Sequence, residues 1–272
     1  MAYRLAWRSG ADSVEPDVVS TRDGVLICRH DLDLALTTDV ADRPEFAHRR
    51  RSVVVDGHVE NGWNVADFDL AEIRELRARE RWPRKRPDSA RYDGRLGVLT
   101  LEELLDLRDS ESQRAGRRLR VHIELKHPEF FAARGLPLHE PLLDLLRSRR
   151  LTSPLSAASV MSFDAGVLKR LRRQVDTDLV QLVDGHEPVK RRRLQKVAAY
   201  ATAVGLHKKL ARPRPIGKVF SVGLDVLVWT LRTERPADVG DLFDLGVDGV
   251  LTDFPEVAVA VRDQRRRSAA AG

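Results

Sequence analysis

Short runs of apolar and β-branched residues alternate with amphipathic stretches along the chain, from residue 11 to about residue 260. Seven of these runs predict strands, at 11–18, 119–125, 158–162, 178–183, 201–206, 224–230 and 247–252. Helical spacing falls between them, for example at 101–107, 141–146, 165–171, 190–199 and 237–245. Because this alternation is typical of repeated βα units, we expect an α/β protein with a parallel sheet.

The number of predicted strands is one short of a closed barrel, which has eight and leaves no backbone groups unpaired at an edge. Tyr3, Leu5 and Trp7, followed by Gly10, have the spacing of the end of a helix that leads into the first predicted strand. A strand is expected before such a helix. The pattern therefore predicts a TIM (β/α)8-type barrel that lacks its first strand in this chain.

Residues 39–97 interrupt the βα rhythm with Trp, Gly, Pro and charged residues around one amphipathic stretch at 70–76. Long loops at the carboxyl ends of barrel strands commonly shape an active site. We expect one barrel domain over residues 1–262, in which 39–97 is an insertion over the active-site face after the second strand, followed by a frayed tail over 263–272.

The composition fits one large domain, with 272 residues of which 42% are hydrophobic. The longest apolar run, 224–231, is far shorter than the roughly 20 residues of a membrane-spanning helix. The single cysteine, Cys28, excludes an internal disulfide and is expected to be a small buried residue. The first residues do not have the pattern of a signal peptide. We expect a cytoplasmic protein without stable membrane insertion, whereas a secreted or periplasmic location stays open if an upstream segment is missing.

The net charge of +6 raises the question of a polyanionic partner. Basic clusters lie at 49–51, 190–193 and 265–267, but they are scattered, stand beside acidic residues and have no interleaved aromatic residues. A solvated surface accounts for this pattern better than a nucleic-acid site. We therefore expect a small-molecule partner and no nucleic acid; the sequence leaves the oligomeric state open.

Two carboxylates near the end of the first predicted strand are the first candidates for chemistry. Glu15 and Asp17 are two residues apart, so both side chains point to one face, and Pro16 marks the end of regular pairing. Like charges this close are unfavourable unless one is protonated or a cation lies between them, and hard oxygen ligands suit Mg²⁺ or Ca²⁺. Two solvated acids at an exposed strand end are the alternative.

The next predicted strand, 119–125, repeats this spacing with His122, Glu124 and Lys126. Glu124 thus brings a third carboxylate to the same barrel rim. Lys126 is a suitable point charge for a phosphate oxygen, whereas a simple ion pair between Glu124 and Lys126 is the alternative.

His30 and Asp31 lie just after the short apolar stretch 25–28, which is expected to be a strand. Histidine is the natural proton carrier near neutral pH, and Asp31 could orient it or join the shell of a metal. A structural role for the pair is the alternative. Trp229 and Asp253 lie at or just after the ends of late strands and so face the same rim; Trp229 could form a wall for the alcohol part of a substrate, although burial in the core fits equally well.

These residues belong to an ordered set of motifs. The set comprises Glu15-x-Asp17, Asp23-Gly24, His30-Asp31, Thr37-Thr38-Asp39, Glu124-x-Lys126, Ser162-Phe163, Trp229-Thr230, and Gly246-Val247-Asp248-Gly249 through Thr252-Asp253-x-Pro255. In order and spacing the set resembles the glycerophosphodiester phosphodiesterase family from residue 2 to about residue 260. The stretch from Val55-Asp56-Gly57 to Leu107 further resembles the branch with an extra insertion after the His-Asp motif.

The resemblance implies a TIM barrel with a divalent cation, Mg²⁺ or Ca²⁺, on Glu15, Asp17 and Glu124. It assigns His30 a general acid/base role and Lys126 a phosphate contact. The implied activity is hydrolysis of glycerophosphodiesters to sn-glycerol 3-phosphate and an alcohol, in glycerophospholipid catabolism.

The front of the chain departs from the family, which opens with a strand carrying a His-Arg pair. Met1 aligns within the first helix, so a second catalytic histidine and a phosphate-binding arginine are absent. Either Met1 is an internal residue taken as a start, or the chain is a genuine short form. The second case leads to the alternative function, a truncated and catalytically impaired barrel that binds a metal or phosphate.

Overall fold

The computed structural model describes residues 1–154, 156–232 and 235–271, which form two compact units. The first unit comprises Met1–Glu15, Arg108–Ile123 and Arg150–Gly272, and the second comprises Pro16–Leu107 and Glu124–Arg149. The predicted division into a barrel over 1–262 and an insertion over 39–97 remains a prediction.

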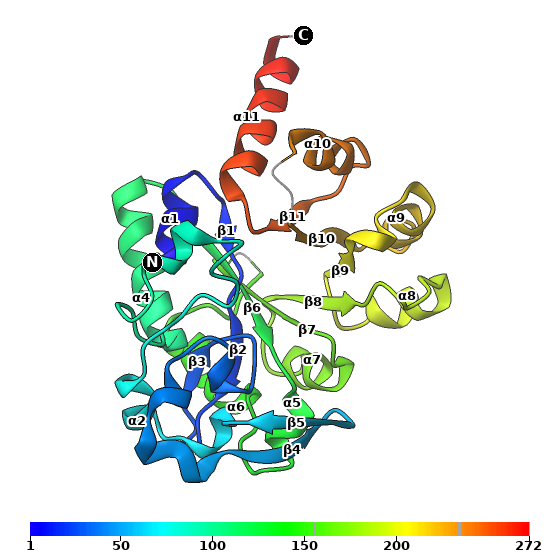
Figure 1. Cartoon of the computed structure of the whole chain (residues 1–272). Helices are drawn as coiled ribbons and strands as arrows, with labels where there is room; N and C mark the ends of the chain where they lie inside the picture. The colour runs from blue at the N-terminus through cyan, green and yellow to red at the C-terminus, as the bar shows by residue number, and fades with distance from the viewer. Residues whose placement is uncertain (155, 233–234, 272) are drawn as a thin grey trace. The chain divides into compact units, whose positions relative to one another are not determined.

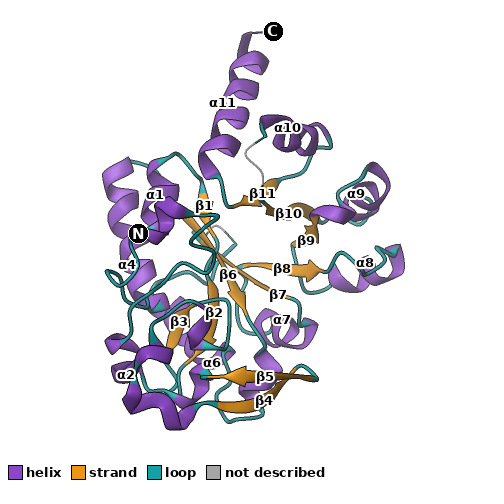
Figure 2. Ribbon diagram, in the orientation of Figure 1, coloured by secondary structure: helices purple, strands orange, loops and turns teal. Residues whose placement is uncertain are grey.

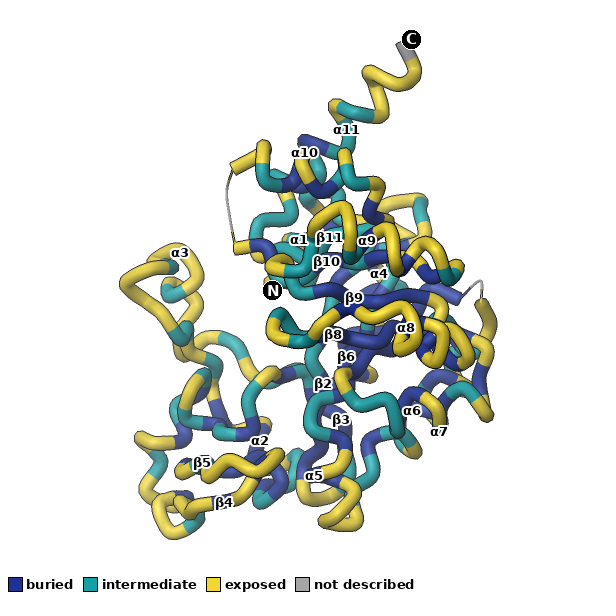
Figure 3. The backbone as a smooth tube through the Cα atoms, turned by 90° about the vertical axis from the view of Figure 1, so that its right-hand side faces the viewer, coloured by how far each residue is buried: buried dark blue, intermediate teal, exposed yellow. Residues whose placement is uncertain are grey.

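The first unit is built on a row of parallel strands. Their order in the sheet follows the chain: β6 (Arg120–Leu125), β7 (Ala158–Ser162), β8 (Asp178–Val183), β9 (Ala203–His207), β10 (Asp225–Leu231) and β11 (Gly249–Thr252). A short strand, β1 (Ser13–Val14), pairs in parallel with the start of β6. Figure 3 shows β8 and β9 as buried strands at the centre of this row.

A helix follows each strand from β7 onward, as Figure 2 shows. These helices are α7 (Ala165–Arg172), α8 (Arg191–Val197), α9 (Pro213–Phe220), α10 (Pro236–Asp244) and α11 (Pro255–Ala271). In α7 the Asp164 carboxylate accepts a hydrogen bond from the backbone of Val167, which starts the helix, and Val167, Leu168 and Leu171 are buried. The short helices α1 (Ala2–Arg8) and η5 (Lys208–Leu210) complete the unit.

The last two residues of β6, Glu124 and Leu125, belong to the second unit. Its strand β2 (Asp17–Ser20) pairs in parallel with the end of β6, and β3 (Leu26–Cys28) pairs antiparallel with β2. The helices α5 (Pro128–Ala132) and α6 (His139–Ser148) follow β6, and α4 (Leu101–Ala115) belongs to this unit as far as Leu107. Val18, Val19 and Ile27 have no exposed surface, so the core of this unit lies on the strands that carry the predicted site.

The segment 39–97 is largely ordered around short elements. It contains η2 (Val40–Asp42), η3 (Pro44–Arg49), η4 (Val65–Asp67), α2 (Leu70–Glu75), α3 (Pro87–Ala90) and a hairpin of β4 (Arg51–Val55) and β5 (His58–Gly62); η1 (Leu34–Leu36) comes just before it. The hairpin turns at Asp56 and Gly57, which both have positive φ, and is visible in Figure 1. The amphipathic stretch 70–76 is confirmed as α2, but the hairpin was not predicted.

The predicted α/β class and TIM-type βα alternation are confirmed, and all seven predicted strands are present. The first, 11–18, is divided into β1 and β2 at Glu15 and Pro16, because proline has no amide hydrogen for the ladder.

The prediction of a frayed tail over 263–272 is wrong for residues 263–271, because α11 continues to Ala271. Arg265 holds this helix by donating two hydrogen bonds to the Asp244 carboxylate, at 2.6 and 2.8 Å. Gly272 lies outside the described residues. None of the helices in the described ranges combines the length and the apolar character needed to cross a membrane.

Candidate functional site

The predicted acidic residues come together at the pairing of β2 with β6. Asp17 lies opposite Glu124 in the parallel register, and the Glu124 amide donates to the carbonyl of Pro16 at 2.9 Å. Glu15 precedes Asp17 by two residues along the chain, and carboxylate oxygens of Glu15, Asp17 and Glu124 all lie within 4.8 Å of one another. The described residues thus contain three carboxylates within the reach of one cation.

Lys126 adds a positive charge to this cluster. Its Nζ lies 2.9 Å from Glu124 Oε1 and 3.6 Å from Asp17 Oδ1. The ion pair that the sequence left open as an alternative is therefore formed, but Lys126 reaches two carboxylates rather than one.

The electrostatics of Glu124 favour an additional cation. Glu124 is only 8% exposed. Burial raises the pKa of Glu124 to about 7; Lys126 opposes this shift, and the negative charge of Asp17 adds to it. The donor set consists of hard oxygen atoms, which suit Mg²⁺ or Ca²⁺, and a divalent cation would stabilise the ionised form of Glu124 against the effect of burial. The residues present therefore fit such an ion.

His30 follows β3 and is tied to Asp17 through the backbone, because the amide of Arg29 donates to the carbonyl of Asp17 at 2.8 Å. The Nδ1 atom of His30 lies 2.9 Å from Asp31 Oδ1, and the other oxygen of Asp31 pairs with Arg81. Partial burial and the charge of Lys126 lower the pKa of His30, so its imidazole is neutral at pH 7. Asp31 thus contacts the His30 ring, as an orienting group must.

His122, which shares the face of Glu124 in the sequence pattern, makes a different contact. Its Nδ1 lies 2.5 Å from the hydroxyl of Ser159 in the first unit. Burial lowers the pKa of His122 to about 4. His122 is therefore neutral at pH 7 and lies half-buried against Ser159.

Trp229 and Asp253 belong to the first unit. Trp229 Nε1 donates to the carbonyl of Gly205 at 2.9 Å, and its ring meets Phe163 and His207 edge to face, with centroids 5.3 and 4.9 Å away. Phe163 is 41% exposed, so this aromatic cluster opens to the surface at the carboxyl ends of β7, β9 and β10. Asp253 Oδ2 lies 3.5 Å from Arg232 Nε. The roles predicted for the site residues stay predictions.

Sequence reasoning missed three basic residues, two of which contact the His30 segment. Arg29 is buried and donates to the backbone of that segment, and Arg81 pairs with Asp31. His127, which follows Lys126, lies with Nδ1 2.6 Å from the carboxylate of Asp56 at the turn of the hairpin. The Arg-His-Asp run was the only available signal for Arg29, because contacts to main-chain carbonyls leave no spacing pattern.

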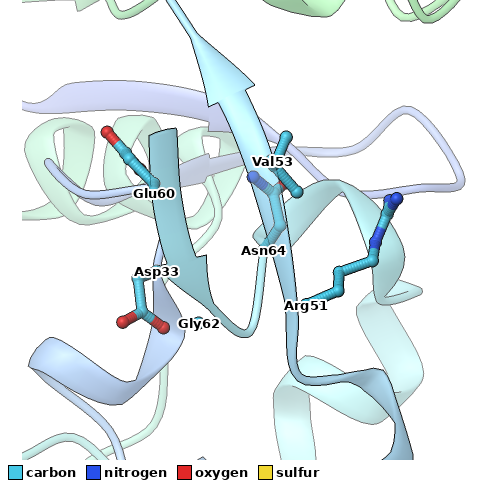
Figure 4. A pocket seen from close by; sticks show the side chains of 6 residues that line it. All are labelled: Asp33, Arg51, Val53, Glu60, Gly62 and Asn64. Atoms are coloured by element: carbon cyan, nitrogen blue, oxygen red, sulfur yellow. The ribbon is translucent and has the colours of Figure 1, made fainter. Parts of the chain in front are cut away.

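The second unit also contains a pocket. It is lined by Asp33, Arg51, Val53, Glu60, Gly62 and Asn64, as Figure 4 shows. It includes none of the predicted site residues.

Comparison with known proteins gives a consistent result. A model described as the glycerophosphoryl diester phosphodiesterase family matches residues 1–257. The glycerophosphodiester phosphodiesterase of Bacillus subtilis is 28% identical over 94% of this chain and 78% of its own length. A probable glycerophosphodiester phosphodiesterase 1 of Mycobacterium tuberculosis is 30% identical over 93% of this chain and 83% of its own. A third relative, glycerophosphodiester phosphodiesterase GDPD6 of Arabidopsis thaliana, is 39% identical over 47% of this chain, which spans only 33% of that protein.

Solved structures agree with the sequence comparison. A putative glycerophosphoryl diester phosphodiesterase from Silicibacter pomeroyi superposes with a TM-score of 0.70 at 26% identity, covering 95% of this chain and 86% of the other. A phosphodiesterase from Oleispira antarctica, solved with the product sn-glycerol-3-phosphate, has the same fold with a TM-score of 0.70 at 19% identity, covering 96% and 89%.

Proposed function

Since the chain belongs to the glycerophosphoryl diester phosphodiesterase family, we propose that it hydrolyses glycerophosphodiesters to sn-glycerol 3-phosphate and an alcohol such as choline or ethanolamine. The reaction would serve the breakdown of glycerophospholipids. The observation that carries the proposal is the meeting of Glu15, Asp17 and Glu124 within 4.8 Å, with Lys126 beside them.

The proposed roles follow from the chemistry of these side chains. A Mg²⁺ or Ca²⁺ ion held by Glu15, Asp17 and Glu124 would neutralise the charge that develops on the phosphoryl group. Lys126 would bind a phosphate oxygen through Nζ. His30 would move one proton at its ring, in an orientation that Asp31 maintains by its contact with Nδ1.

Trp229 would contribute to substrate binding. The ring of Trp229, partly buried beside the exposed Phe163, would form an apolar wall against the substrate. Asp253, which pairs with Arg232, would support the residues that contact the metal or the substrate without touching either itself.

The experiment measures hydrolysis of glycerophosphocholine and glycerophosphoethanolamine after chelation and after addition of Mg²⁺ or Ca²⁺. We expect activity that returns with the ion. Glu124→Gln should abolish this metal-dependent activity, whereas the exposed acid Asp144, changed to Asn, serves as the matched control. Normal rates in Glu124→Gln would refute the ligand assignment.

Calorimetry on the same preparations separates an enzyme from a barrel that only binds. Cation binding without any turnover of either substrate would support the impaired metal-binding or phosphate-binding alternative and contradict the proposed reaction.

A further inference from the structure

We propose that Arg29 is a positioning residue for His30, because its guanidinium holds the backbone on both sides of the Asp31–Asp33 turn. The proposal rests on the proton-transfer role proposed for His30. It concerns a residue whose side chain donates to main-chain carbonyls of Asp31 and Asp33.

Arg29 donates hydrogen bonds to three main-chain carbonyls, two of them through its side chain. Its Nε donates to the carbonyl of Asp31 and its Nη2 to the carbonyl of Asp33, both at 2.7 Å. Its own amide donates to the carbonyl of Asp17 at 2.8 Å. One residue therefore connects the strand end that carries Asp17 with the segment that carries His30 and Asp31.

The guanidinium that makes these hydrogen bonds is almost fully buried. Arg29 is 8% exposed. Burial lowers the pKa of Arg29 to about 10, and the carboxylate of Asp33 opposes this change, so the guanidinium stays charged at neutral pH. A buried guanidinium needs well-aligned acceptors, and here two main-chain carbonyls supply them. The planar fork of arginine fits two separated carbonyls, which a lysine ammonium cannot hold in the same way.

The side chain of Asp33 makes further hydrogen bonds at the carboxyl-terminal end of the segment that follows His30. Its Oδ1 accepts hydrogen bonds from the amides of Ala35 at 3.0 Å and Trp63 at 2.9 Å. The carboxyl group lies against Gly62, as Figure 4 shows, and a Cβ at residue 62 would stand only 2.3 Å from Asp33 Cγ. Gly62 is therefore needed for this approach, and Gly62→Ala should disturb the segment without touching Arg29.

The first test measures hydrogen exchange of the amides of residues 30–36, together with the free energy of unfolding. In Arg29→Gln we expect exchange in this segment to increase at least about tenfold, while the amides of β6 keep their protection. Gly62→Ala should produce the same local pattern, and Arg29→Lys an intermediate one. Arg149→Gln is the matched control, because Arg149 is an ion-paired arginine of the same unit that makes its contacts to Asp106 and Glu102 on α4. Unchanged exchange at 30–36, or an equal increase throughout the protein, would overturn the proposal.

The second test is a double-mutant cycle on the rate of hydrolysis. Arg29→Gln should lower kcat at least about tenfold with little change in KM, and should have less than about a twofold effect when His30 is already alanine. Independent, multiplicative losses would show that Arg29 does not act through His30. If no phosphodiester is hydrolysed, the proposed reaction fails, but the exchange experiment still decides the role of Arg29.

Discussion

Asp17 and Glu124 face each other at one position of the parallel register between β2 and β6. The register brings the two carboxyl groups together at the start of β2 and near the end of β6. The charge balance at this point decides how the site responds to pH and to substitution.

The affinity for a divalent cation should depend on pH through Glu124. Its pKa is raised to about 7 without a cation, and a proton on the carboxyl group competes with the metal. Affinity should therefore fall about tenfold for each pH unit below 7 and level off above it. Calorimetry with Ca²⁺ between pH 5.5 and 8.5 measures this; an affinity that does not change below pH 7 would contradict it.

Replacing Lys126 by Met should shift that pH dependence upward. Lys126 lowers the pKa of Glu124, so its removal raises the pKa further and the plateau of cation binding moves to higher pH. Loss of the phosphate contact should also increase KM by roughly 10-fold to 100-fold, as expected for a hydrogen bond to a charged group. The exposed lysine Lys85, changed to Met, is the control. A normal KM in the Lys126→Met variant would refute the proposed contact between Lys126 and a phosphate oxygen.

Replacing Trp229 by Ala should weaken substrate binding and leave cation binding intact. The aromatic wall of a pocket is worth about 1–3 kcal/mol, so KM should rise roughly 10-fold or more. Phe220 is an equally apolar residue with 41% exposure on α9, and Phe220→Ala should change neither quantity. Equal KM values for the two variants would argue for a purely structural Trp229.

Glu111 should stabilise the first unit against acid. Its carboxylate accepts hydrogen bonds from Arg8 at 2.7 and 3.1 Å and from Arg114 at 2.7 Å, and these contacts lower the pKa of Glu111 to about 2. A lowered folded-state pKa means that the stabilisation is complete above the ordinary value of 4.5 and is lost as the pH falls through about 2.

Thermal unfolding of Glu111→Gln checks this prediction. The difference in Tm from the parent protein should be full at pH 6 and should shrink as the pH is lowered from 4.5 toward 2. Asp176→Asn, a change at an exposed acid in the same unit, is the control. A Tm difference that stays constant at low pH would assign the loss to packing rather than to the charge.

The carboxylate cluster could be predicted because it depends on two regular features. Side chains alternate along a strand, which puts Glu15 with Asp17 and Glu124 with Lys126 on common faces, and parallel neighbours end at a shared edge. The break at Pro16 also follows from the sequence, since proline cannot donate to the ladder.

Other parts of the site could not be found in this way. Arg29 acts on main-chain carbonyls, and Arg81 reaches Asp31 from 50 positions further along the chain, so neither has a fixed spacing. The hairpin of β4 and β5 did have a signal, because Asp56-Gly57 between two short runs is a common turn, but the polar residues of 58–62 obscured the second strand. The end of the chain is helical, and Arg265 in this helix contacts Asp244. The composition of the tail alone does not predict this contact.

The amide of Arg29 and the carbonyl of Asp17 give β2 and β3 a common main-chain connection. Anyone who wishes to graft this chemistry onto another scaffold must therefore transfer both strands, the end of β6 and the turn at residues 30–33 as one block. Transferring only the acidic side chains to another pair of strands would leave out the main-chain connection that joins the His30 segment to Asp17.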